Sequence, residues 1–171
     1  MKFSLSLNSE HGPTAEAVKL ALRAEKQGLD CVWYCQDLFK RDVWVFLTAA
    51  ASFTKRIKLG TGIVNPYTVN PAELAMHAAT LDEYSGGRVQ LGISVGAIEF
   101  LKWIGKEAEH PLSAMRESVQ LIRRLLNGDR VEHSGRVFRG WTADAYMRFT
   151  PLRSSIPIYL GAQSRGMLEL I

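Results

Sequence analysis

The sequence predicts an α/β protein in which parallel strands alternate with helices, in the pattern of about the first five units of an eight-stranded (β/α)8 TIM barrel. Strand-like segments begin near Lys2, Cys31, Lys58 and Val89, so each strand and its following helix occupy about 30 residues, the length of one βα unit. A fifth segment begins at Ile156. An open doubly wound sheet is the alternative architecture, because the same repeat also builds such sheets.

Each expected strand is a short run rich in β-branched, aromatic and other apolar residues, bounded by turn-forming residues. These strands cover 2–7, 31–37, 58–64, 89–95 and 156–162. The segments between them carry apolar residues at helical spacing and have helix-start and helix-stop residues at their ends. The expected helices lie between Pro13 and Gly28 and over 43–52, 71–84 and 112–126.

The connection from the fourth strand to the fifth is too long for a single unit. Its excess includes the run RVEHSGRVFRG, two short extended stretches that we expect to turn at Ser134-Gly135. We therefore expect one domain over 1–171 with a hairpin or extended excursion around 129–150. Because five strands cannot close an eight-stranded barrel, we expect the chain either to lack its C-terminal half or to be completed by another copy.

Composition and charge argue against several classes of function. The longest nearly apolar stretch, 43–53, is far shorter than the roughly 20 residues that cross a bilayer, and the first residues do not resemble a signal peptide. We therefore expect a cytoplasmic protein without a membrane partner. The net charge of +4 comes from lysines and arginines spread along the chain, so no nucleic-acid partner is expected. The 4 histidines are dispersed and lack the spacing of metal ligands, so no metal site is expected.

In parallel β/α folds the ligand lies at the carboxyl ends of the strands, so the residues just after each expected strand are the functional candidates. Asp37 ends the second strand and could accept a hydrogen bond from a polar cofactor edge or cap the next loop. In the third strand, Gly62 allows the backbone to bulge toward a ligand beside Ile63, Val64 and Asn65.

Small residues repeat at the next two strand ends. Gly96 and Ala97 follow the fourth strand, and Gly161 and Ala162 end the fifth. Such residues leave room for a planar, phosphate-tailed ligand, although they are equally compatible with tight loops. Gln163 precedes a helix start, where it could bind a phosphate or take part in an ordinary helix cap.

Long runs of the sequence resemble the bacterial luciferase-like superfamily. The runs LGTGIVNPYTVNP and AMHAATLDEYSGGRVQLGISVG resemble its third and fourth units, and the NPY within the first resembles the deazaflavin-dependent branch. The run PIYLGAQSRGMLEL is similar to the fifth strand and helix start of methylenetetrahydromethanopterin reductases. The resemblance implies the N-terminal part of a TIM barrel of the luciferase-like type.

The resemblance also implies an oxidoreductase that transfers hydride between the deazaflavin coenzyme F420 and a small organic substrate. We expect a homo-oligomer or completion of the barrel by a missing C-terminal half. A monooxygenase of the same superfamily that uses flavin mononucleotide (FMN) is one alternative, and a non-catalytic fragment or subunit is another. A non-proline cis peptide bond is implied at Gly62-Ile63. By the same carry-over, Asp37 would meet the polar edge of the ring, Asn65 and Gly96 would line the ring pocket, and Gly161, Ala162 and Gln163 would hold the phosphate side.

Three positions depart from the reductase pattern. Ser6 stands where the reductases resemble one another in carrying a glutamate, Ala97 replaces an acid, and Ser164-Arg165 replaces Gly-Pro. The resemblance therefore supports the cofactor class more strongly than the pterin-reductase activity, and no catalytic acid or base is named.

Overall fold

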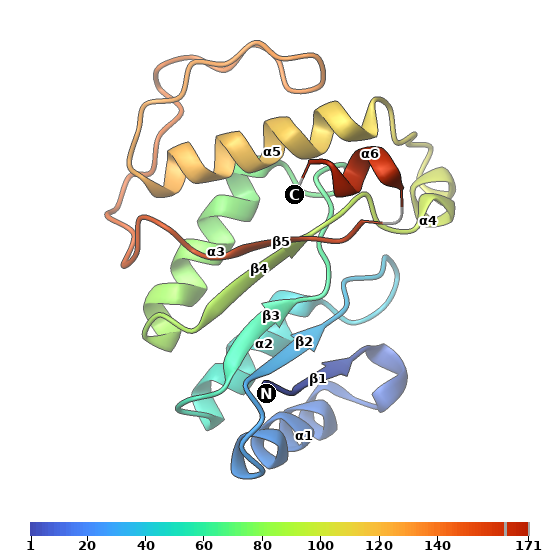
Figure 1. Ribbon diagram of the computed structural model, residues 1–171, viewed down its shortest axis with the longest axis vertical. Helices are drawn as coiled ribbons and strands as arrows, with labels where there is room; N and C mark the ends of the chain where they lie inside the picture. The colour runs from blue at the N-terminus through green and yellow to red at the C-terminus, as the bar shows by residue number, and fades with distance from the viewer. Residues whose placement is uncertain (163, 171) are drawn as a thin grey trace.

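The computed structural model describes residues 1–162 and 164–170 and contains a five-stranded parallel sheet (Figure 1). Its strands are β1 (Ser4–Leu7), β2 (Cys31–Tyr34), β3 (Lys58–Thr61), β4 (Val89–Ile93) and β5 (Ile158–Leu160). They pair in sequence order, β1-β2-β3-β4-β5, and every neighbouring pair is parallel. A doubly wound sheet reverses its strand order at a switch point, whereas a barrel wall does not. The observed order is therefore that of a barrel wall, and the doubly wound alternative is wrong.

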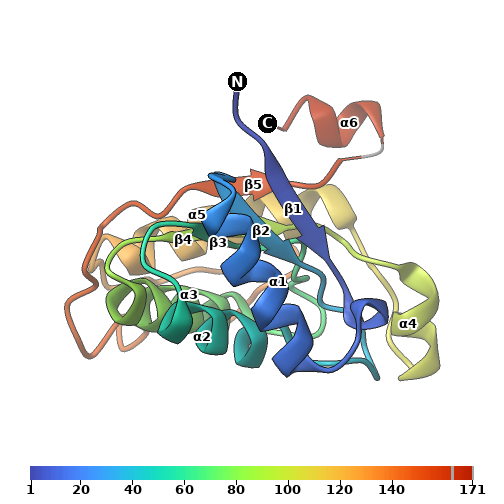
Figure 2. The ribbon, with the colours of Figure 1, turned by 90° about the horizontal axis from the view of Figure 1, so that it is seen from below.

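Four longer helices follow the first four strands. They are α1 (Thr14–Lys26), α2 (Val43–Phe53), α3 (Pro71–Ser85) and α5 (Pro111–Leu126). Figure 2 shows α1, α2 and α3 on the same side of the strands, and α1 packs on α2, α2 on α3, and α3 on α5. This arc of helices on one face is the arrangement of the outer ring of a (β/α)8 barrel. None of the described helices has the length and apolar character needed to cross a membrane.

The core lies between the sheet and this arc of helices. Alternate strand residues such as Leu7, Val32 and Leu59 are almost completely buried there, as period-2 side-chain alternation predicts. The opposite face carries Trp33, whose ring meets Tyr159 of β5 edge to face at a centroid distance of 5.0 Å. Tyr159 is 49% exposed, so this face of the sheet is only partly covered within the described residues.

Charged side chains hold the amino ends of the strands. The buried carboxylate of Glu25 on α1 accepts hydrogen bonds from three successive backbone N–H groups just before β3, at residues 55–57. Burial by itself raises the pKa of Glu25, but these N–H groups outweigh burial and hold the pKa below its ordinary value. Next to β4, Arg153 Nε donates to the fully buried Asp82 at 2.8 Å. In barrel folds this end of the sheet serves stability.

The structure corrects the sequence expectations in three places. The strands β2 to β5 end two or three residues earlier than expected, because the residues after Tyr34, Thr61, Ile93 and Leu160 leave the regular ladder and form a rim. A short helix, α4 (Ile98–Trp103), was missed because six residues are too few to show a helical period. Two further short helices, η1 (Ser9–His11) and α6 (Arg165–Leu168), complete the elements.

The third correction concerns the turn within the excursion at 129–150, which returns alongside α5 (Figure 1). It has a single antiparallel bridge, between His133 and Trp141, in place of a regular hairpin. Gly135 N donates to Phe138 O at 2.8 Å, so the turn lies two residues after the expected Ser134-Gly135. The cause is Glu117 of α5, whose carboxylate accepts three backbone N–H groups, those of residues 136–138, and so draws the turn onto the helix.

Candidate functional site

The structure brings most of the candidate residues together at the carboxyl end of the sheet. One cavity of about 130 Å³ is lined by Asp37, Gly62, Ile63, Asn65, Gly96 and Ala97, among others. An adjoining cavity of about 570 Å³ is lined by Ile63, Gly96, Gly161 and Ala162, among others. Because Ile63 and Gly96 line both cavities, the two adjoin at these residues and together make up the candidate site. Val64 is fully buried behind it, and Gln163 lies outside the described residues.

A backbone bulge after β3 forms the wall between the two cavities. Regular pairing of β3 with β4 covers Leu59 and Gly60 and resumes as an isolated bridge from Val64 to Ile93. Between these points lies a cis peptide bond at Gly62-Ile63, at the position that the family resemblance implied. Gly62 N donates to Tyr34 O on β2 at 2.8 Å, which holds the bulge on its other side.

Glycines let the backbone segments of the site approach one another. A side chain at Gly92 would overlap the carbonyl oxygen of Thr61, and the Cβ of a residue at Gly161 would lie 3.0 Å from Cβ of Ser94. Gly96 has a φ of +76°, a left-handed conformation that other residues rarely adopt. Its missing side chain would lie 3.2 Å from Nδ2 of Asn65. These positions together form a cradle in which added Cβ atoms would crowd or distort the rim.

Asn65 presents a hydrogen-bond donor at the site. Its Oδ1 accepts from Tyr67 N at 3.1 Å, from Thr68 N at 2.9 Å and from the Thr68 hydroxyl at 3.1 Å. These three donors fix the orientation of the amide, so Nδ2 is on the side of Gly96. The Asn65 residue is 8% exposed, and Nδ2 has no hydrogen-bond partner among residues 1–162 and 164–170.

The other polar groups of the site come from the segment after β2. The Asp37 carboxylate is partly exposed, and its nearest cation is Lys40 Nζ at 3.9 Å, a distance that leaves its oxygens able to accept hydrogen bonds. Gln36, by contrast, is occupied, because its Oε1 accepts from Val43 N at the start of α2 at 2.7 Å. Cys35 also lines the smaller cavity, and burial raises the pKa of its thiol.

Two features of the site escaped the sequence analysis. Cys35 was not among the candidate residues, although its position directly after β2 was a usable signal. The second feature is an aromatic rim on and beside α4, comprising Phe39, Phe100 and Trp103, with ring centroids 6.2 Å apart for Phe39 and Trp103 and 5.0 Å apart for Phe100 and Trp103. Phe39 is 73% exposed and Trp103 66% exposed, so this rim offers aromatic surface beside the smaller cavity.

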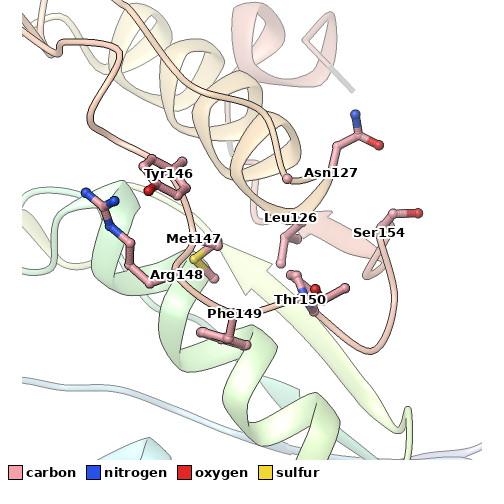
Figure 3. Close-up of a pocket in the computed structure, with 10 residues that line it drawn as sticks. Leu126, Asn127, Tyr146, Met147, Arg148, Phe149, Thr150 and Ser154 are labelled. Atoms are coloured by element: carbon pink, nitrogen blue, oxygen red, sulfur yellow. The ribbon is translucent and has the colours of Figure 1, made fainter.

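A separate cavity of about 370 Å³ lies at the C-terminal end of α5, beside Leu126 and Asn127 (Figure 3). Its other wall is the excursion, where the guanidinium groups of Arg130 and Arg148 lie over the ring of Tyr146 at 4.1 and 3.8 Å. This cavity is at the amino ends of the strands, which serve stability in barrel folds, so it is not the functional candidate. The described residues contain no group of three or more His, Cys, Asp or Glu placed to hold a metal ion.

Comparison with known proteins identifies the family of the chain. The family model of luciferase-like monooxygenases matches residues 1–171. A 5,10-methylenetetrahydromethanopterin reductase of Archaeoglobus fulgidus is 42% identical over 147 residues, which cover 86% of this chain and 43% of that protein. An F420-dependent glucose-6-phosphate dehydrogenase of Rhodococcus hoagii is 33% identical over 178 residues, covering 95% and 51%.

Solved structures give the same result. The coenzyme F420-dependent tetrahydromethanopterin reductase of Methanopyrus kandleri matches with a TM-score of 0.89 and 32% identity over 99% of this chain and 52% of that one. The oxygenating constituent of a Baeyer-Villiger monooxygenase of Pseudomonas putida, in complex with FMN, has a TM-score of 0.79 at 21% identity and shows the fold alone. The chain spans about half the length of these relatives. With a barrel wall in sequence order and a family match along its whole length, this chain belongs to the luciferase-like monooxygenase family.

Proposed function

We propose that this protein is an oxidoreductase that binds coenzyme F420 at the rim of the sheet and transfers hydride between that coenzyme and a small organic substrate. The observation that carries the proposal is the convergence of the bulge at 61–64, the cradle glycines and the Nδ2 group of Asn65, which has no partner among the described residues, around two adjoining cavities. The relatives named as F420-dependent, at 30–33% identity, support this choice of coenzyme.

The residues at the rim suit a flat, polar-edged ring. The bulge and the cradle glycines offer close backbone approach, Asn65 offers a donor, and Asp37 offers an acceptor. The coenzyme supplies the hydride chemistry when it is bound. The tasks of the chain are then to bind the ring, to orient it toward the substrate and to exclude water from the reacting faces. In this proposal Gly161 and Ala162 face the phosphate side of the coenzyme, and the aromatic rim of Phe39, Phe100 and Trp103 is on the substrate side.

Titration of the purified chain with coenzyme F420, followed by the fluorescence of the deazaflavin, tests the proposal. We expect saturable binding with a dissociation constant in the micromolar range, on the order of −8 kcal/mol. A matched titration with FMN serves as the control. Saturation by FMN at lower concentration than by coenzyme F420 would contradict the choice of coenzyme.

An FMN-dependent monooxygenase is the second candidate function, because the family model that covers the chain describes luciferase-like monooxygenases. The same rim would serve either ring system, so the titration discriminates between the two. Binding of neither coenzyme would favour the third possibility, a non-catalytic fragment or subunit.

We also propose that the barrel is completed by strands additional to the five described here. The edge strands β1 and β5 each pair on one side within the described residues, and Trp33 and Tyr159 are only partly covered on the inner face. Unpaired strand edges are normally paired or covered in stable proteins. A longer chain of the same protein is expected to bind the coenzyme more tightly than residues 1–171, and equal affinity of both would contradict this part of the proposal.

The outer face of α2 and α3 supports a homo-oligomer. The segment Val43–Phe53 contains no charged residue, although Val45 and Phe53 are 62% and 64% exposed. On α3, Met76 and Tyr84 extend the apolar face, and the hydroxyl groups of Ser52 and Tyr84 lie 2.9 Å apart. We expect a second copy of this chain to cover this face, since large exposed apolar patches mark interfaces.

Sedimentation velocity over a range of protein concentrations tests the homo-oligomer. The change Val45→Glu is expected to give a monomer, because it places a charge within the apolar face. The matched control is Leu152→Glu, which charges an apolar residue that is 55% exposed elsewhere. An unchanged oligomer in the Val45 variant would exclude this face as the interface.

A further inference from the structure

The hydroxyl group of Thr61 takes the place of a missing backbone pairing at the bulge. Thr61 is the last residue of β3 and is 0% exposed. Its Oγ1 donates to Gly92 O at 2.8 Å and accepts from Gly92 N at 2.8 Å. One side chain therefore bonds to both backbone groups of Gly92, a residue within β4.

These hydrogen bonds replace a backbone hydrogen bond that Gly92 loses because of the bulge. Where β3 leaves the ladder after Gly60, it no longer supplies a backbone acceptor for Gly92 N. A buried N–H group without a partner is costly, so something else has to accept from it. A hydroxyl group can donate and accept at once, which an aliphatic side chain of the same shape cannot do.

The Thr61 hydroxyl group lies next to the wall of the candidate site along the chain. The next two residues are Gly62 and Ile63, joined by the cis peptide bond, and Ile63 lines both cavities. Val64 N returns to the same carbonyl, Gly92 O, at 3.0 Å. The bulge is thus fastened to a single residue of β4 at both of its ends, by the side chain of Thr61 before it and by backbone after it.

We propose that Thr61 is a positioning residue for the coenzyme, because its hydroxyl holds the bulge at the depth at which Ile63 forms the wall of the ring pocket. The role as a coenzyme positioner rests on the proposed function, whereas the fastening of the bulge does not. A similar hydroxyl bond occurs at the next strand pair, where Ser94 Oγ donates to Gly161 O at 2.7 Å.

The test compares three variants of the whole chain. Thr61→Val keeps the branched shape and removes both hydrogen bonds, and Thr61→Ser keeps the hydroxyl. The matched control is Thr54→Val, because Thr54 is also 0% exposed and its hydroxyl also makes two hydrogen bonds. Thr54 Oγ1 donates to Ala50 O at 2.6 Å and accepts from Arg88 Nη1 at 2.9 Å, near the amino end of β3.

Two measurements are made on each variant: nuclear magnetic resonance of the free chain, and fluorescence titration with coenzyme F420. In the free chain, Thr61→Val is expected to speed hydrogen exchange at the Gly92 amide about tenfold and to shift the methyl resonances of Ile63. In the titration, it is expected to raise the dissociation constant about tenfold. Thr61→Ser and Thr54→Val are expected to stay within about threefold of the unaltered chain in the titration.

If Thr61→Val leaves the hydrogen-exchange rate of the Gly92 amide and the methyl resonances of Ile63 unchanged, Thr61 does not fasten the bulge. Altered resonances combined with unchanged affinity, or equal weakening by Thr54→Val, would overturn the positioning role. If the unaltered chain binds no coenzyme, the proposed function fails together with the coenzyme-positioning role, and the resonance data still decide whether Thr61 fastens the bulge.

Discussion

Replacing Asn65 with aspartate tests whether its amide serves as a donor to the ring of the coenzyme. The substitution is nearly isosteric and leaves Oδ1 in place to accept from Tyr67 N and Thr68 N. It changes Nδ2, the atom on the side of Gly96, from a donor to a negatively charged acceptor. The hydrogen bonds within the loop are therefore retained, while the group that faces the site changes from a donor to an acceptor.

The expected magnitudes for Asn65→Asp follow from these contacts. Loss of one hydrogen bond to a polar ring edge, leaving an unpaired group beside it, is expected to cost about 2 kcal/mol of binding free energy. This corresponds to a roughly thirtyfold higher dissociation constant. The free energy of unfolding is expected to change by less than about 1 kcal/mol, since a carboxylate accepts from backbone N–H groups at least as well as an amide.

Fluorescence titration with coenzyme F420 and urea unfolding measure the two effects separately. Asn70→Asp is the matched control, because Asn70 Oδ1 accepts from Ala72 N at 2.9 Å as the N-cap of α3, outside the site. Aspartate is an equally good N-cap, so this variant should bind the coenzyme like the unaltered chain. Unchanged affinity in Asn65→Asp, or an equal loss in Asn70→Asp, would refute the donor role of Asn65.

Substitutions at three further positions test which residues stabilise the fold and shape the rim. Burial raises the pKa of Glu117, but backbone N–H groups outweigh it and lower the pKa below its ordinary value of 4.5. Its carboxylate therefore stabilises the folded chain above about pH 4.5 and loses that effect as the pH falls through the lowered pKa. Glu117→Gln should remove about 2 kcal/mol of stability at pH 7 and less at pH 3, as measured by urea unfolding, and an equal loss at both pH values would contradict this account. Arg153→Met leaves the fully buried Asp82 without its cation and should cost about 3 kcal/mol, whereas Arg165→Met, which removes an exposed pair, should cost less than about 0.5 kcal/mol in the same assay. Gly96→Ala forces a side chain into a left-handed conformation, so it should cost about 1 kcal/mol in urea unfolding and weaken coenzyme binding in the fluorescence titration; native affinity would place Gly96 outside the ring pocket.

The repeating units and the gathering of the candidate residues at one rim could be predicted because both depend on local sequence patterns. Apolar periodicity and helix-end residues place the helices within a few residues, and the rule of carboxyl ends gathers Asp37, Asn65 and Gly96 at one rim. The doubly wound alternative remained open because the order of strands in a sheet is set by long-range packing. The structure decides it through the pairing of each strand with its successor.

The features that escaped prediction depend on contacts between distant residues. Thr61 and Gly92 are 31 residues apart, and neither position in the sequence indicates that a hydroxyl group replaces a strand bond. The turn of the excursion lies at 136–137 because Glu117, about 20 residues earlier, accepts its N–H groups. Side-chain contacts of this kind have no local pattern, so they become visible only when the fold is known.

One end of the sheet stabilises the fold and the other carries the candidate site, and this separation affects how the sequence can evolve. The buried carboxylates of Glu25 and Asp82 secure the end opposite the rim, so mutations in the loops after the strands need not loosen the scaffold. Random libraries confined to 38–41 and 104–110, which leave out the buried Leu101, should therefore yield many folded variants. Such tolerance would let a single scaffold diversify its chemistry by drift at one end while selection preserves the other.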